Sequence, residues 1–112
     1  ITDFDHADIY GGYTTEATFG AALRESGIDR SKIQLITKCG IQYVSEARPV
    51  KIKHYDYSFE HIIASAEQSL ANLQTDYLDV FLLHRPSPLL QPEEVAKAVT
   101  RLLESGKIRS FG

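Results

Sequence analysis

Short apolar segments alternate along this chain with longer segments of helical period, and this alternation constrains the fold more than any other feature. The clearest apolar segment is residues 78–83, where Val80 to Leu83 form a continuous run typical of a strand covered on both faces. We expect further strands at residues 1–5, 33–39 and 107–112. Regular strand–helix alternation predicts a parallel sheet with right-handed crossovers.

Three segments between these strands have the apolar spacing of a helix that covers a sheet. The first begins after Thr14 or Thr15, whose hydroxyl can cap it, and Gly27 provides a left-handed end. The second begins after Ser58, and the third begins at Pro92, a residue favoured at the first helical position. Their apolar faces comprise Phe19, Ala22 and Leu23, then Phe59, Ile62, Ile63, Ala66, Leu70 and Leu73, then Val95, Val99, Leu102 and Leu103.

Residues 40–57 have no helical period and form the longest expected loop. Loops of this length are more often functional lids or binding segments than plain connectors. No G-x-G-x-x-G follows any strand, so the Rossmann fingerprint is missing. We therefore expect a partial (β/α)8 TIM barrel, with an open doubly wound sheet or a flavodoxin-like binding module as the alternatives that the alternation leaves open.

Composition excludes several classes of function. The net charge of -3 provides no basic surface for nucleic acid or for an anionic membrane, and no apolar run reaches the roughly 20 residues of a membrane helix. Cys39 is the only cysteine, so an internal disulfide framework is excluded and a cytoplasmic setting is favoured. The chain starts without Met and stops inside an expected strand. We therefore expect residues 1–112 to be a single partial domain of a longer protein.

Four polar side chains stand at or just after the ends of the expected strands. Asp5 closes the first strand, Lys38 nearly closes the second and His84 closes the third, while Tyr10 follows Asp5 in the next loop. Active sites in α/β folds gather at the carboxyl ends of parallel strands. Each residue alone has an ordinary explanation: a turn residue, a solvated strand end, a satisfied core histidine or a ring packed on the sheet.

Together the four groups suit protonation of an oxygen as it becomes an alkoxide. Tyrosine ordinarily has a pKa of about 10, too high for an efficient general acid near neutrality. A neighbouring ammonium favours the phenolate, and a carboxylate can hold that ammonium in place. A neutral histidine can orient an incoming carbonyl oxygen by a hydrogen bond. Hydride addition to a carbonyl requires such a site.

The motifs around these residues resemble those of the aldo/keto reductase family. Residues 4–11, FDHADIYG, are similar to the family signature, in which an Asp is followed five positions later by the catalytic Tyr and then by a glycine. Residues 36–38, ITK, resemble the strand with the family lysine, and residues 76–86, DYLDVFLLHRP, resemble the segment that ends in its histidine. The resemblance runs through the whole chain, from barrel strand two to strand five. It is closest to a bacterial subgroup of small oxidoreductases.

This resemblance implies roles for the four residues. Tyr10 would be the general acid, Lys38 the partner that makes it more acidic, Asp5 the counter-ion of Lys38 and a contact of the cofactor, and His84 the group that orients the carbonyl. Tyr13 competes for the acid role, but its distance from Asp5 does not fit the motif. The family implies NADPH, less often NADH, as cofactor, a small-molecule carbonyl compound as substrate, and no metal.

The resemblance also leaves a second function open. Barrel relatives that bind a nicotinamide cofactor as sensors or regulatory subunits can retain the same four residues.

His6 stands where many relatives have Thr or Ser, and Cys39 is expected to be a small buried residue. Most of the cofactor site would lie outside these 112 residues. By themselves they would expose two strand edges and an apolar sheet face, so we expect them to aggregate or fold marginally.

Overall fold

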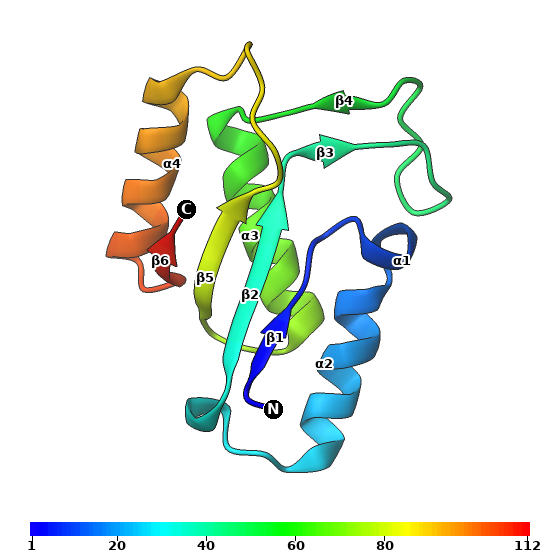
Figure 1. Ribbon diagram of the computed structural model, residues 1–112, viewed down its shortest axis with the longest axis vertical. Helices are drawn as coiled ribbons and strands as arrows, with labels where there is room; N and C mark the ends of the chain where they lie inside the picture. Colours follow the sequence, from blue (N-terminus) through cyan, green and yellow to red (C-terminus); the bar gives the residue numbers. More distant parts are fainter.

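The computed structural model describes all residues from 1 to 112 and consists of a parallel sheet with three long helices (Figure 1). The four strands of the sheet are β1 (Asp3–Asp5), β2 (Gln34–Cys39), β5 (Leu78–Leu83) and β6 (Ile108–Phe111). The helices α2 (Thr15–Ser26), α3 (Phe59–Leu73) and α4 (Pro92–Glu104) each follow one of the first three strands. The expected order of elements is therefore confirmed.

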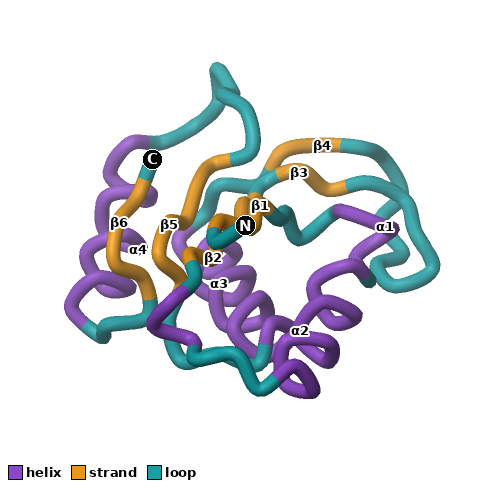
Figure 2. Tube along the Cα trace, turned by 60° about the horizontal axis from the view of Figure 1, so that its bottom comes forward, coloured by secondary structure: helices purple, strands orange, loops and turns teal.

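The strands lie in the sheet in the same order as in the chain, β1-β2-β5-β6, and every neighbouring pair is parallel. The helices gather on one side of the sheet, as the turned view in Figure 2 shows. A doubly wound sheet reverses its winding at a switch point and carries helices on both faces. The observed winding never reverses, so it is that of a barrel segment and not of a flavodoxin-like module.

The hydrophobic core lies between the sheet and the helices. Leu35 of β2 and Phe81 of β5 are fully buried there against Ile62, Leu73 and other apolar residues of the helices. The other face of β5 is less covered: Val80 and Leu82 are half-buried. The helices pack on only one face of the sheet, so the other face of β5 is only partly covered within these 112 residues, as expected for a partial domain.

Most of the expected helix ends are confirmed, and one cap is not. The Ser58 hydroxyl accepts a hydrogen bond from the His61 N–H, Pro92 is the first residue of α4, and Gly27 is left-handed with φ 66°. The Thr14 hydroxyl does not cap α2 but donates to the Gly11 carbonyl at 2.7 Å. The reason is that a short turn, α1 (Tyr10–Tyr13), directly precedes α2.

Two residues expected on apolar helix faces are exposed, Ala22 and Leu103. The side chain of Leu102 fills the interface between α4 and the sheet and is 1% exposed, whereas Leu103 is 42% exposed. Successive helical residues point about 100° apart, so two neighbours cannot both face the centre of one interface.

Residues 40–57, which we expected to be a long loop, include some regular structure. They contain a small antiparallel hairpin of β3 (Ile41–Gln42) and β4 (His54–Tyr55), which projects from the carboxyl end of β2 (Figure 1). Each strand has only two residues, too few for an alternating pattern to appear in the sequence.

A 3-10 turn, η1 (Arg30–Lys32), precedes β2. None of the helices combines the length and apolar character that crossing a membrane requires.

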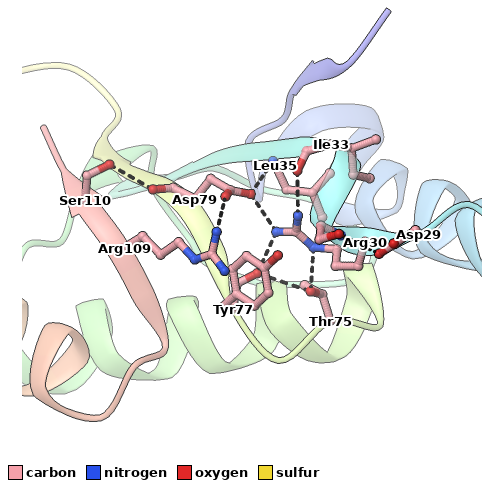
Figure 3. A network of polar contacts seen from close by, with 10 residues as sticks. Asp29, Arg30, Ile33, Leu35, Thr75, Tyr77, Asp79, Arg109 and Ser110 are labelled. Carbon is pink, nitrogen blue, oxygen red and sulfur yellow. Dashed lines mark hydrogen bonds and ion pairs between the residues drawn. The ribbon is translucent and has the colours of Figure 1, made fainter.

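A polar network joins the strands near their amino ends (Figure 3), whereas the hairpin projects from their carboxyl ends (Figure 1). The Asp79 carboxylate of β5 accepts hydrogen bonds from the Arg30 guanidinium at 2.7 Å and from the Leu35 N–H at 2.9 Å. Arg109 of β6 lies 3.4 Å from its other oxygen. Both guanidiniums also stack on the Tyr77 ring, at 4.0 and 3.7 Å from its centroid. One carboxylate therefore connects β2, β5, β6 and η1.

Replacing Asp79 with Asn in the complete protein should lower the free energy of unfolding by about 1.5–3 kcal/mol, because charge-assisted hydrogen bonds are lost and Arg30 keeps a poorly compensated charge. Urea unfolding measures this change. Asp76→Asn is the matched control, since Asp76 is exposed and makes no ion pair. Equal unfolding midpoints for the two variants would show that the network does not stabilise the sheet.

Candidate active site

The register of the parallel strands brings three of the predicted site residues to one edge of the sheet. Asp5 of β1 pairs with Ile36 of β2, which lies two residues before Lys38 and faces the same side of the sheet. Lys38 in turn pairs with Leu82 of β5. The His84 N–H continues the ladder by donating to the Cys39 carbonyl at 2.8 Å. The three side chains therefore start from adjacent strand ends.

Lys38 is the centre of the arrangement. Its ammonium donates to Asp5 Oδ1 at 2.6 Å and to the His6 carbonyl at 2.7 Å. The Lys38 side chain is 13% exposed, whereas that of Asp5 is 59% exposed. Two short hydrogen bonds therefore fix the ammonium, while the carboxylate still faces solvent with Oδ2 free of any protein partner.

Tyr10 and His84 complete the cluster. The Lys38 ammonium lies 5.4 Å from the centroid of the Tyr10 ring, and the rings of Tyr10 and His84 meet edge to face at 6.0 Å and 81°. Tyr10 is 38% exposed. The structure thus brings all four predicted residues together, in the order carboxylate, ammonium, phenol and imidazole, with the phenol accessible from solvent.

The surroundings of His84 favour its neutral form. Burial lowers the pKa of this imidazole, the charges of Lys38 and Arg85 lower it further, and Asp5 opposes them. Nδ1 is buried without a hydrogen-bond partner, whereas Nε2 is not enclosed in this way. A neutral imidazole with one accessible nitrogen can donate or accept a hydrogen bond at that atom, according to its tautomer.

Tyr13, the competitor for the acid role, is engaged elsewhere. Its hydroxyl donates to the Ile41 carbonyl at 3.4 Å and accepts from the Tyr43 N–H at 3.3 Å. Burial raises the pKa of Tyr13, and the hydrogen bond from Tyr43 opposes this shift. These contacts place its hydroxyl against the hairpin.

Three buried residues surround the cluster. Cys39 is fully buried, as expected, and burial raises the pKa of its thiol. His6 is buried against the Phe19 ring, with 4.4 Å between the ring centroids, and neither of its ring nitrogens has a hydrogen-bond partner. Burial lowers its pKa. Burial raises the pKa of Asp8 to about 7, while Arg48, 3.7 Å away, opposes the shift.

The sequence did not reveal two further tyrosines that contact the site backbone. The Tyr43 hydroxyl donates to the Ile9 carbonyl at 2.7 Å, and the Tyr57 hydroxyl donates to the His84 carbonyl at 3.1 Å. Both belong to residues 40–57. The length of this segment indicated a functional role, but no motif distinguished these hydroxyls from any others.

Comparison with known proteins gives consistent matches along the whole chain. The chain is 58% identical over 113 residues to the uncharacterized oxidoreductase YcsN of Bacillus subtilis and 45% identical over 113 residues to a 6-dehydroglucose reductase of Agrobacterium fabrum. It is also 36% identical over 113 residues to a putative voltage-gated potassium channel subunit beta of Schizosaccharomyces pombe. Each match covers 100% of this chain but only 38%, 38% and 31% of the respective relative.

The solved structures agree. The holo form of an aldo-keto reductase from Bacillus halodurans superimposes with a TM-score of 0.85 at 32% identity, over 100% of this chain and 36% of that chain. Such neighbours are (β/α)8 barrels, so the chain forms a fragment of a barrel. The sequence profile of the aldo/keto reductase family matches residues 1–112. With the four clustered side chains at the carboxyl ends of its strands, the chain belongs to the aldo/keto reductase family.

Proposed function

We propose that the complete protein reduces aldehydes or ketones to alcohols with hydride from NADPH, and that Tyr10 supplies the proton. The observation that carries this proposal is the contact between Lys38 and its partners, which sets a fixed ammonium beside an accessible phenol and a neutral imidazole. The name of the 45% identical relative, a 6-dehydroglucose reductase, supports the same direction of reaction. A cytoplasmic setting is part of the proposal.

The residues present fit a nicotinamide cofactor. When bound, this group supplies the hydride. Oδ2 of the exposed Asp5 carboxylate is free to accept a hydrogen bond from a hydroxyl group, and half-buried Leu82 and Ile36 offer apolar surface on the same face of the sheet. Asp5 is therefore the residue of this chain that we assign to cofactor contact, in addition to its ion pair with Lys38.

The four side chains account for the proton. The carbonyl oxygen gains negative charge as its carbon receives hydride, and the Tyr10 hydroxyl donates its proton to that oxygen. The tyrosinate that remains is stabilised by the Lys38 ammonium, which Asp5 holds in place. Neutral His84 donates a hydrogen bond to the same oxygen and directs it towards Tyr10.

A regulatory function is the second candidate, because one relative is named as a putative channel subunit. In that function the same residues would bind a nicotinamide cofactor without turnover. Steady-state reduction of simple aldehydes by the complete protein distinguishes the two functions.

Replacing Tyr10 with Phe in the complete protein should lower kcat for aldehyde reduction by about 10²–10⁴-fold, because the general acid is lost. The dissociation constant for NADPH, measured by fluorescence titration, should stay nearly unchanged. Tyr77→Phe is the control, since Tyr77 directly precedes β5 and its ring belongs to the network at the amino ends of the strands. A Tyr10→Phe enzyme that keeps half of the wild-type kcat would exclude Tyr10 as the acid.

Replacing Lys38 with Met should lower kcat and move the pH dependence of the remaining reduction to higher pH. The physical reason is that no positive charge then favours the phenolate. The pH–rate profiles of the variant and the wild-type enzyme measure this shift. Profiles that superimpose would remove Lys38 from the mechanism.

Replacing His84 with Gln should be milder for small aldehydes than Lys38→Met, because glutamine still offers a hydrogen-bond donor to the carbonyl. The comparison requires kcat/KM for both variants with the same aldehyde. A larger loss in the His84→Gln enzyme would assign proton transfer, and not orientation, to His84.

A further inference from the structure

The backbone that carries Tyr10 is strained. Gly11, Gly12 and Tyr13 follow Tyr10 with φ values of 60°, 66° and 70°, three consecutive residues in the left-handed region. Glycine adopts this region freely, but Tyr13 does so against steric repulsion of its Cβ. Such a conformation persists only where surrounding contacts enforce it.

Residues 40–57, the segment that contains the β3–β4 hairpin, supply those contacts. The Tyr43 ring stacks on the Tyr13 ring at 5.1 Å with an interplanar angle of 21°. The Tyr43 hydroxyl donates at 2.7 Å to the Ile9 carbonyl, which belongs to the peptide that joins Ile9 to Tyr10. Arg48 lies 4.3 Å from the centroid of the Tyr13 ring and 3.7 Å from the buried Asp8 carboxylate. The hairpin therefore contacts the chain on both sides of Tyr10.

The other end of the same segment contacts the backbone that carries His84. The Tyr57 hydroxyl donates to the carbonyls of His84 and Arg85. Arg85 has φ 86°, so the chain turns sharply just after His84. The Tyr57 ring is buried directly over Gly40, where an added Cβ would lie 1.9 Å from a ring carbon. Gly40 therefore allows the ring to reach its position.

We propose that Tyr43 and Tyr57 are positioning residues: the Tyr43 hydroxyl fixes the peptide that precedes Tyr10, and the Tyr57 hydroxyl fixes the peptide that follows His84. The inference rests on the proposed function, because it concerns the acid and the orienting group of that reaction. Lys38 lies on the strand that leads directly into this segment. Residues 40–57 thus connect the strand that carries Lys38 to the backbone beside Tyr10 and to the backbone beside His84.

The variants Tyr43→Phe and Tyr57→Phe in the complete protein test this proposal, because each removes one hydroxyl and keeps the ring. Small displacements of reacting groups reduce rates strongly, so we expect kcat to fall by about 5- to 100-fold. The dissociation constant for NADPH and the melting temperature should change little. Tyr55→Phe is the matched control: Tyr55 lies in the same segment, is 41% exposed, and its hydroxyl makes no hydrogen bond within the protein.

Double variants separate positioning from general stabilisation. If Tyr43 acts through Tyr10, Tyr43→Phe should have no effect on the residual rate of the Tyr10→Phe enzyme. In the same way, Tyr57→Phe should have no effect in a His84→Ala enzyme, which has no side chain left to orient the carbonyl. Equal factors in the wild-type and substituted backgrounds would overturn the proposal, as would single variants that behave like Tyr55→Phe.

Hydrogen exchange provides a readout that does not depend on turnover. The Tyr13 N–H donates to the Ile9 carbonyl and the Thr14 N–H to the Tyr10 carbonyl. Tyr43→Phe should speed exchange of these two amides and leave that of the Arg85 N–H unchanged, whereas Tyr57→Phe should do the reverse. If the wild-type protein has no reductase activity but the variants show this exchange pattern, the proposed function is contradicted and the positioning contacts are not. Unchanged exchange in both variants would overturn the positioning role.

Discussion

Parallel pairing of β1, β2 and β5 in a single register is the constraint on which the rest of the structure depends. It sets Asp5 and Lys38 on neighbouring strands, close enough for their 2.6 Å ion pair, and places His84 at the next strand end. A slip of one residue would turn the Lys38 side chain to the helix side of the sheet, because successive residues of a strand face opposite sides. The same register buries Leu35 and Phe81 against the helices.

The amino ends and the carboxyl ends of the strands differ in their contacts and exposure. At the amino ends of the strands, Asp79 and its two arginines hold β2, β5 and β6 together, and both guanidiniums stack on the Tyr77 ring. At the carboxyl ends, the side chains of Asp5 and Tyr10 face solvent, and left-handed residues follow Tyr10 and His84. This arrangement is typical of barrel enzymes, in which one end stabilises the fold and the other carries the chemistry.

Residues 40–57 occupy a particular place in this arrangement. They enter directly from the strand that carries Lys38, and their tyrosine hydroxyls reach the backbone beside Tyr10 and His84. A strained backbone keeps a defined conformation only while other contacts hold it. The hairpin provides such contacts through Tyr43 and Arg48, and the buried Tyr57 provides them at its other end.

The sequence by itself determined the elements that depend on local pattern: the 78–83 strand, the Ser58 cap, the start of α4 at Pro92, and the placement of Asp5, Lys38 and His84 at or beside strand ends. These features follow from side-chain period, capping chemistry and motif spacing, which are local. Only the tertiary structure decided the unreversed strand order, the exposure of Leu103, the hairpin and the hydroxyl contacts of Tyr43 and Tyr57. These features join residues far apart in the chain. A phenol that holds a carbonyl some 30 residues away has no signature in the residues beside it, so the sequence alone could not reveal it.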